Sequence, residues 1–159
     1  MIMKQVSLFF LLLMACAQPR KETAAAAPSK GLPAFMMTLT SGEQQMSNSL
    51  PGNLILIFYN PDCDHCQREA KEIGERLDLF RKYSLYFIAA SPMERIKQFA
   101  MEYKLAGQSN VVFAAAAVPD VVREMGPMGT PCMFIYSQEK ELKKKFDGET
   151  PIEEIAKAL

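Results

Sequence analysis

Three stretches of the chain carry unbroken runs of apolar residues, and each run is followed by a segment with helical periodicity. The runs are N-L-I-L-I-F-Y-N (53–60), S-L-Y-F-I-A-A-S (84–91) and N-V-V-F-A-A-A-A (110–117). Continuous runs of this length favour strands that are buried on both faces of a sheet. Because the strands alternate with helices, the pattern predicts an α/β sheet with helices on both faces.

The segments between the runs have the spacing of amphipathic helices. In residues 64–80 apolar residues recur at steps of three and four, which predicts one helix with Gly74 as a weak point. The next helix is expected to begin at S-P-M-E, with the Ser91 hydroxyl as its cap and Pro92 as its first helical residue. A third, shorter helix is expected to end at Gly126.

Hairpins are predicted on either side of this alternating region. Ser41-Gly42 is a plausible turn between two short alternating segments, which predicts a small β-hairpin. C-M-F-I-Y (132–136) and E-L-K-K-K-F (141–146) predict two further strands, and P-I-E-E-I-A-K-A-L (151–159) predicts a closing helix. The expected architecture is a central mixed β-sheet flanked by helices, with an N-terminal β-hairpin extension.

The N-terminal residues have the pattern of a targeting segment. Residues 1–15 combine Lys4 with an apolar run that has the length of a signal-peptide core and is too short to span a bilayer. The small residues before Cys16 resemble a bacterial lipobox, which implies cleavage before Cys16 and lipidation of its sulfur. An ordinary signal peptide that happens to contain a cysteine is the alternative. Residues 16–30 lack apolar periodicity and predict a flexible tether, so the folded domain is expected over residues 31–159.

Length and charge limit the class of protein. The chain has 159 residues, and its 18 basic side chains balance its 18 acidic ones. The length suits one domain with a sizeable core. Because neither sign of charge dominates, nothing points to nucleic acid as a partner.

Two cysteines flank the chain's single histidine in C-D-H-C, directly after the first apolar run. Cys63 is expected at a helix N-terminus, where the helix dipole and free N–H groups favour a thiolate. A thiolate attacks disulfides, and Cys66 is close enough to attack the resulting mixed disulfide and release the partner. A structural zinc site usually needs four ligands, and a fixed bridge across so short a loop would stabilise the fold little. The spacing therefore predicts reversible dithiol exchange.

The order of elements, with F-Y-N-P-D-C-D-H-C (58–66) and M-G-T-P-C-M-F-I-Y (128–136), resembles the thioredoxin fold. More narrowly, residues 31–159 resemble the TlpA/ResA-type membrane-anchored thiol-disulfide oxidoreductases of bacteria. The resemblance implies thiol-disulfide exchange without a metal or other cofactor, on protein thiols or disulfides, together with a membrane redox partner. It also implies a lipoprotein of the cell envelope that faces the periplasm and is anchored through Cys16. The substrate and the net direction of exchange stay open.

The resemblance also assigns roles to individual residues. The Thr130–Pro131 peptide bond is expected to be cis, and the two residues to form a substrate-binding wall beside the cysteines. The alternative is an ordinary trans proline at a strand start. Glu69 is expected to lie near the cysteines and to accept the proton of Cys66, whereas the alternative is a solvated helix charge.

His65 has two interpretations. As a cation or donor it would stabilise the Cys63 thiolate and face the substrate, although Asp64 works against this effect. The alternative is a structural histidine without a switching role.

Three positions depart from the thioredoxin pattern. Asp62 stands where an aromatic residue often precedes the first cysteine, and Ile57 stands where many thioredoxins carry a buried acid. Cys132 directly follows the expected cis-proline. It is interpreted as a small buried apolar residue, or alternatively as a third redox-active thiol. In a second hypothesis of a different class, Cys63, Cys66 and Cys132 together bind copper or zinc.

Overall fold

The computed structural model describes residues 31–159 of the chain. The predicted signal peptide (1–15), the lipidation of Cys16 and the tether (16–30) therefore lie outside the described residues. Over residues 31–159, no helix has the length and apolar character that crossing a bilayer requires.

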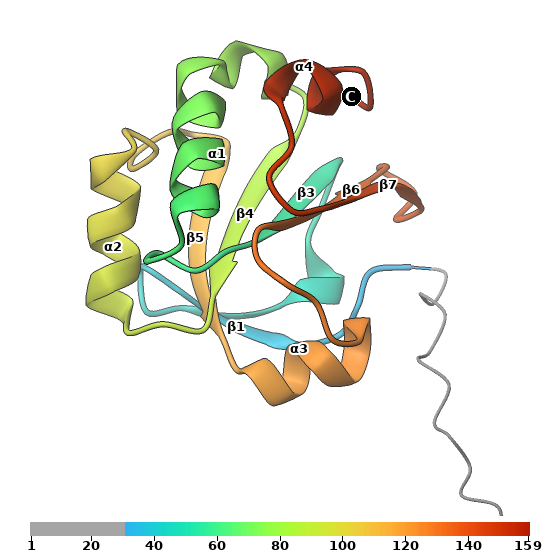
Figure 1. Ribbon diagram of the computed structural model, residues 1–159. Coiled ribbons are helices and arrows are strands. Elements are labelled where there is room, and N and C mark those ends of the chain that lie inside the picture. Colours follow the sequence, from blue (N-terminus) through green and yellow to red (C-terminus); the bar gives the residue numbers. More distant parts are fainter. Residues whose placement is uncertain (1–30) are drawn as a thin grey trace, which may run out of the picture.

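A seven-stranded mixed sheet forms the centre of the molecule (Figure 1), with the strand order β2-β1-β5-β4-β3-β6-β7. Its strands are β1 (Met36–Leu39), β2 (Gln44–Met46), β3 (Leu54–Phe58), β4 (Ser84–Ala89), β5 (Val111–Ala116), β6 (Cys132–Tyr136) and β7 (Leu142–Asp147). The three predicted buried runs are the neighbouring parallel strands β3, β4 and β5. All other pairs are antiparallel. The predicted mixed sheet is therefore confirmed.

Helices cover both faces of the sheet, as expected, but not equally. The helices are α1 (Asp64–Glu75), α2 (Met93–Glu102), α3 (Val118–Met125) and α4 (Ile152–Ala156). One core lies beneath α1, α2 and α4, which contribute Ile73, Phe99 and Ile155. The other core receives Val121 from α3, together with Phe35 from the N-terminal segment. Figure 1 shows α3 apart from the other three helices.

The alternation of side chains along β3 explains why its whole apolar run is needed. Ile55 and Ile57 point into the core beneath α1, whereas Leu54, Leu56 and Phe58 point into the core beside α3. Successive side chains of a strand point to opposite faces, so a strand covered on both sides must be apolar throughout.

The predicted N-terminal hairpin is confirmed and widens the main sheet. Strand β1 pairs antiparallel with β2 and also with β5. The turn contains Gly42 at φ +90°, a left-handed conformation that favours glycine.

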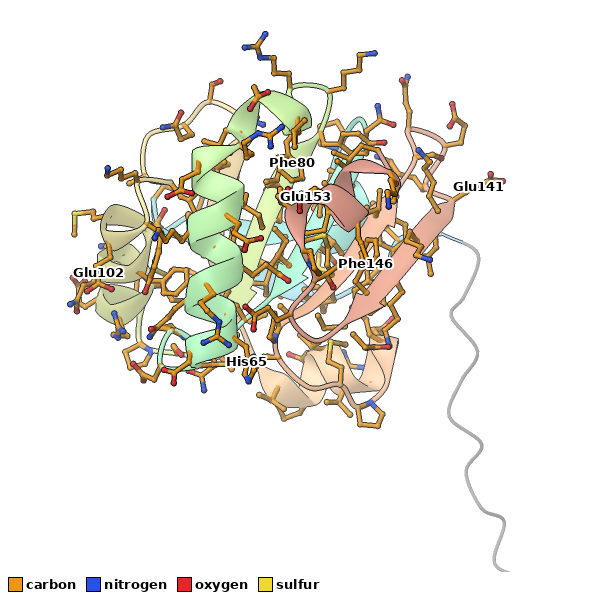
Figure 2. The ribbon with its side chains drawn as sticks, turned by 45° about the horizontal axis from the view of Figure 1, so that its top comes forward. His65, Phe80, Glu102, Glu141, Phe146 and Glu153 are labelled. Carbon is orange, nitrogen blue, oxygen red and sulfur yellow. The ribbon has the colours of Figure 1, made fainter. Side chains whose placement is uncertain are left out.

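Two predicted helix boundaries were wrong. The helix expected over residues 64–80 ends at Glu75, because Arg76 leaves the helical conformation, and a short 3₁₀ turn then carries the fully buried Phe80 into the core. Figure 2 labels Phe80 beyond the end of α1. At the second helix, Ser91 makes no capping hydrogen bond. Pro92 itself occupies the cap, since its carbonyl oxygen accepts the N–H groups of the first helical turn.

Candidate active site

The first cysteine occupies the junction between β3 and α1. A tight turn leads from β3 to Cys63, whose N–H donates to the carbonyl oxygen of Asn60 at 3.1 Å. Cys63 has extended dihedral angles and is the N-cap residue of α1. The carbonyl oxygen of Cys63 accepts the N–H of Gln67 at 3.0 Å. The predicted position of Cys63 at a helix start is confirmed. At such a position the N–H groups of the first helical turn have no partner within the helix.

The two cysteines of the motif differ sharply in exposure. Cys63 is half-buried, whereas Cys66 is only 2% exposed. Both are free thiols. The Cys66 sulfur accepts the backbone N–H of Asn60 at 3.5 Å. Burial, and to a smaller extent the neighbouring Cys63, raises the pKa of Cys66 to about 12, so Cys66 is a neutral thiol at neutral pH.

The segment before β6 forms the opposite wall of the site. The Thr130–Pro131 peptide bond is cis, the isomer that the resemblance implies. The carbonyl oxygen of Thr130 lies 3.8 Å from the sulfur of Cys63. The carbonyl oxygen of Pro131 accepts the N–H of Gly148 at 2.9 Å, which ties this wall to the loop after β7.

Glu69 lies one helical turn beyond Cys66 and is only 3% exposed. The interpretation of Glu69 as a solvated helix charge was therefore wrong. Its Oε2 atom accepts the backbone N–H of Thr150 at 3.0 Å. Burial raises the pKa of Glu69 to about 7, and the hydrogen bond from Thr150 opposes that rise. A carboxyl group in this environment gains and loses a proton near neutral pH.

His65 faces the loop after β7, and Figure 2 shows it at the N-terminal end of α1. Its Nδ1 atom lies 2.6 Å from Oε2 of Glu149 and 2.8 Å from Nη2 of Arg68. Arg68 also donates to both carboxylate oxygens of Glu149, at 2.7 and 2.6 Å. These partners, Arg68 first, lower the pKa of Glu149 to about 2. The hydrogen-bond contacts of His65 are thus with Arg68 and Glu149, while its expected effect on Cys63 stays a prediction.

Asp62, which replaces the usual aromatic residue, is paired with a cation. Its Oδ1 atom accepts a hydrogen bond from Nε of Arg95 on α2 at 3.0 Å. Arg95 also donates to the carbonyl oxygen of Pro61 at 3.2 Å. The pair offsets part of the negative charge that Asp62 places next to Cys63 and links the active-site turn to α2.

Cys132 is 1% exposed and packs in the core beside α3, whereas Cys66 packs in the core beneath α1. Its thiol donates to Oδ1 of Asp147 at 3.2 Å, and burial raises the pKa of Cys132 to about 12. These properties fit a small buried side chain. Within residues 31–159, no three His, Cys, Asp or Glu side chains lie close enough together to hold a metal ion. The three-thiol metal site is therefore not assembled.

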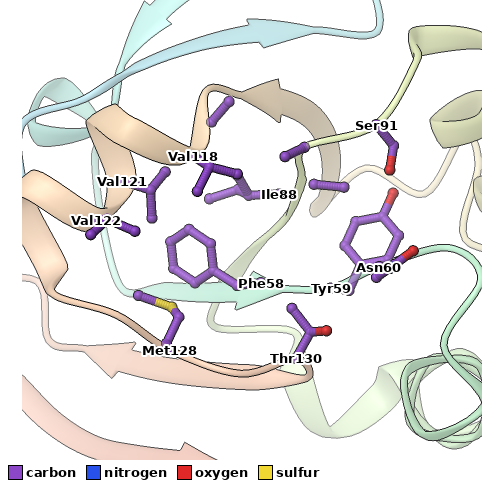
Figure 3. A pocket seen from close by; sticks show the side chains of 13 residues that line it. Phe58, Tyr59, Asn60, Ile88, Ser91, Val118, Val121, Val122, Met128 and Thr130 are labelled. Atoms are coloured by element: carbon purple, nitrogen blue, oxygen red, sulfur yellow. The ribbon is translucent and has the colours of Figure 1, made fainter.

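An apolar groove of about 320 Å³ begins at Thr130 and runs between α3 and the carboxyl ends of β3 and β4. Figure 3 shows Val118, Val121 and Val122 of α3 facing Phe58 across it. Val118 and Val122 are 56% and 39% exposed, and both line the groove from α3. The groove offers a surface for apolar side chains beside the cysteine pair.

Tyr59 lines the same groove at the end near Ser91 (Figure 3). Among residues 31–159, its hydroxyl is the one buried side-chain oxygen or nitrogen that lacks a hydrogen-bond partner. Its ring packs against the ring of Phe99, with centroids 4.5 Å apart.

The sequence pattern did not indicate a role for Arg68, Glu149 or the exposed valines of α3. The valines could have been found, because V-P-D-V-V places Val118 and Val122 one turn apart on one side of a helix. The pairing of Arg68 with Glu149 has no local signal, since 81 positions separate them.

No model of a known protein family matches the chain, and no curated protein matches it either. Solved structures do match it. A secreted disulfide oxidoreductase of Mycobacterium tuberculosis, homologous to E. coli DsbE, has 18% identity and a TM-score of 0.64, over 79% of this chain and 93% of that chain. StoA from Bacillus subtilis has 16% identity and a TM-score of 0.63, over 83% and 98% of the two chains.

Copper-bound ScoI from Arabidopsis thaliana has 13% identity and a TM-score of 0.64, over 81% of this chain and 94% of that chain. A thioredoxin-like protein from Aeropyrum pernix matches with 18% identity and a TM-score of 0.61, over 79% and 89% of the two chains. At these identities the likeness concerns the fold. It confirms the predicted thioredoxin-like fold.

Proposed function

We propose that this protein is a thiol-disulfide oxidoreductase that exchanges electrons with cysteines of other proteins through Cys63 and Cys66. One observation carries the proposal: a half-buried Cys63 caps α1 while Cys66, one turn behind it, is sealed from solvent. A substrate can reach Cys63, which therefore suits the attack on its disulfide. It cannot reach Cys66, which therefore suits the resolution of the mixed disulfide.

In the reducing direction, the Cys63 thiolate attacks one sulfur of a substrate disulfide, and the other substrate sulfur leaves as a thiolate. Cys63 and the substrate are then joined by a mixed disulfide. Cys66 next gives its proton to Glu69 and attacks the Cys63 sulfur, which breaks the mixed disulfide and releases the second substrate thiolate. The substrate gains two electrons, and the protein retains a Cys63–Cys66 disulfide. A redox partner must supply two electrons to restore the dithiol; the same steps in reverse oxidise a substrate.

The walls of the site support a polypeptide substrate. Thr130 and Pro131 lie beside Cys63, so an extended substrate segment can run along their backbone. The groove that begins at Thr130 can receive an apolar side chain of that segment. His65 is exposed at the start of α1, and we propose that it also faces the substrate.

We further propose that the protein belongs to the TlpA/ResA-type proteins and works outside the cytoplasm, facing the periplasm and anchored through lipid on Cys16. The apolar run before Cys16 supports this location. One neighbour of the same fold is a secreted disulfide oxidoreductase. A membrane protein is the redox partner that such a location favours.

Metal binding is the second candidate, because copper-bound ScoI shares the fold. Cys63 and Cys66 would supply two soft ligands. Over the described residues a third ligand is not in place, and Cys132 packs on the other side of the sheet. This candidate is therefore the weaker one.

A redox titration tests the proposal. The purified, metal-free protein is equilibrated in graded thiol–disulfide buffers, its free thiols are alkylated, and the modified cysteines are mapped by mass spectrometry. We expect a two-electron transition confined to Cys63 and Cys66, and its midpoint indicates whether the protein acts as a reductant or an oxidant. No transition in the accessible range, or a transition that includes Cys132, would contradict the two-cysteine mechanism.

Substitutions separate the roles of the cysteines. Cys66→Ser is expected to accumulate the mixed disulfide on Cys63, because the resolving thiol is gone. Cys63→Ser should form none, and Cys132→Ser should behave as the unaltered protein. If the protein bound copper or zinc at about one ion per molecule and Cys63→Ser bound none, the result would favour the metal-binding candidate instead.

A further inference from the structure

The loop between β7 and α4, residues 148–151, connects the two walls of the proposed site. At one end, Gly148 donates its N–H to the carbonyl oxygen of Pro131 at 2.9 Å. At the other end, Thr150 donates its N–H to Oε2 of Glu69 on α1 at 3.0 Å. The loop therefore contacts both the cis-proline segment and the buried carboxyl group behind the cysteines.

A paired set of charges holds this loop to α1. Arg68 and Glu149 form two parallel hydrogen bonds, Nε to Oε1 at 2.7 Å and Nη2 to Oε2 at 2.6 Å. Two such bonds fix orientation as well as distance. Arg68 directly precedes Glu69, and Glu149 directly precedes Thr150. The ion pair and the buried hydrogen bond therefore lie next to each other, and both join α1 to the loop 148–151.

His65 adds a third member to the pair. Its Nδ1 atom lies within hydrogen-bond distance of both Glu149 and Arg68. A neutral His65 can accept a hydrogen bond from Arg68, whereas a protonated His65 donates to Glu149. Arg68 and Glu149, joined by two hydrogen bonds, make the principal contact of this cluster.

We propose that Arg68 and Glu149 are positioning residues: their ion pair holds the N–H of Thr150 on the Glu69 carboxylate and so sets the pH range in which Glu69 accepts the proton of Cys66. This inference rests on the proposed thiol-disulfide exchange. Neither residue touches the reacting sulfur atoms; both act through the loop.

The charges around Glu69 make the direction of the effect definite. Glu72 from α1 and Glu149 from the loop disfavour the charged form of Glu69, and the Cys132 thiol from β6 lies within electrostatic range. Arg68 neutralises Glu149 and, through it, keeps the loop in place. Loss of Arg68 exposes the charge of Glu149 and weakens the hydrogen bond from Thr150. Both changes favour the protonated form of Glu69, so they add.

The test uses Arg68→Met, which removes the guanidinium and keeps an apolar stem on a half-exposed side chain. Arg76→Met is the matched control, because Arg76 directly follows the same helix and pairs with Asp78 outside the cluster. Carbon NMR of labelled glutamate follows the titration of Glu69, whose signal is identified by its loss in Glu69→Gln. We expect the Glu69 midpoint to rise by about one pH unit in Arg68→Met and to stay unchanged in Arg76→Met.

A second readout follows the chemistry itself. An aromatic disulfide such as dithiobis(nitrobenzoate) reacts with Cys63 and releases one coloured thiolate; the attack of Cys66 then releases the second. The rate of the second release should rise with pH through the Glu69 midpoint, and in Arg68→Met its profile should move upward by the same amount. Arg68→Lys should give an intermediate shift, since one cation remains but the paired geometry is lost.

The double variant Arg68→Met/Glu149→Gln separates positioning from charge alone. It is neutral at these two positions, as the ion pair is, so a simple charge effect would return the Glu69 midpoint to its original value. A midpoint that stays raised supports the loss of the Thr150 hydrogen bond. A midpoint that returns, or an unmoved midpoint in Arg68→Met, would overturn the inference. A Glu69 midpoint that rises in Arg68→Met while the pH profile of the second thiolate release stays in place would also overturn the inference. Failure of the proposed function would show differently, as absence of any second release in the unaltered protein.

Discussion

The Oε2 atom of Glu69 lies 3.0 Å from the backbone nitrogen of Thr150, beneath a loop that leaves the Glu69 side chain only 3% exposed. The N–H of Thr150 stabilises the carboxylate, but burial disfavours it more, so the pKa of Glu69 rises to about 7. The proposed proton acceptor for Cys66 therefore titrates in the range where exchange would operate. The same burial makes the stability of the fold depend on pH.

The first prediction concerns that dependence. In the unfolded chain Glu69 has an ordinary pKa of 4.5, so between pH 4.5 and about 7 the folded protein retains a proton that the unfolded chain has lost. The contribution of Glu69 to stability is therefore fully present below pH 4.5 and is lost as pH rises through about 7. A shift of this size corresponds to about 3 kcal/mol. Urea unfolding from acidic to neutral pH should show this decline in the unaltered protein and not in Glu69→Gln.

Glu75→Gln is the control for this series, because Glu75 is exposed at the end of the same helix. Its stability should follow that of the unaltered protein at every pH. Parallel curves for Glu69→Gln and the unaltered protein would show that Glu69 does not carry a raised pKa.

The second prediction concerns the reactivity of the three described cysteines. Cys66 and Cys132 are 2% and 1% exposed, and burial raises the pKa of each to about 12. Each is thus both neutral and shielded at pH 7, and alkylation needs an accessible thiolate. Brief treatment of the reduced, folded protein with iodoacetamide should modify Cys63 alone among the three. Treatment after unfolding should modify all three; early modification of Cys132 in the folded protein would contradict its assignment as a buried side chain.

The third prediction contrasts two tyrosine hydroxyls. The Tyr59 hydroxyl is buried without a partner, whereas the Tyr83 hydroxyl donates to the carbonyl oxygen of Leu159 at 3.0 Å and accepts from Lys143 at 3.1 Å. An unpaired buried hydroxyl costs free energy, and a paired one contributes it. Tyr59→Phe should raise the free energy of unfolding by about 1 kcal/mol, and Tyr83→Phe should lower it by about the same amount. Equal effects of the two substitutions in urea unfolding would refute the distinction.

The local part of the site could be predicted from sequence because its causes are local. A fully apolar strand followed by a helix that begins at the first cysteine needs only neighbouring residues, and Cys63 was placed correctly. The environment of Glu69 could not be predicted, since Thr150, whose N–H binds its carboxyl group, is 81 positions away. His65 and Glu149 are 84 positions apart, so their hydrogen bond could not be predicted from the sequence for the same reason.

The prediction of two helix boundaries was wrong for a related reason. Periodicity continues through residue 80, yet the helix ends at Glu75 so that Phe80 can enter the core. Packing in the core determines whether the helix continues or ends there, and a periodic pattern in the sequence carries no information about that packing. Ser91 was expected to cap α2 on propensity alone, and Pro92 took the position instead.

The fourth prediction concerns Gly74, which lies on α1. Alanine at an exposed helical glycine normally stabilises a protein. At Gly74, however, a Cβ atom would lie 2.7 Å from the carbonyl oxygen of Tyr103, a backbone atom with little freedom to move. Gly74→Ala should therefore lower the free energy of unfolding by about 1–3 kcal/mol. Lys71→Ala, exposed one turn earlier, should change it by less than about 0.5 kcal/mol; a stabilised Gly74→Ala would refute the close approach.

The last prediction concerns the groove beside Thr130 and rests on the proposed function. Val122 of α3 lines the groove and is 39% exposed. A carboxylate there would lose its water when an apolar substrate side chain binds, which costs free energy, while the core is little affected. Val122→Asp should lower kcat/KM for a protein disulfide about tenfold, a loss of about 1.4 kcal/mol of transition-state stabilisation. Its rate with a small disulfide should not change, because a small molecule needs Cys63 but not the groove. Met101→Asp, on the exposed face of α2, should alter neither rate; equal losses with both kinds of disulfide would show that Val122 supports the cysteines and not substrate binding.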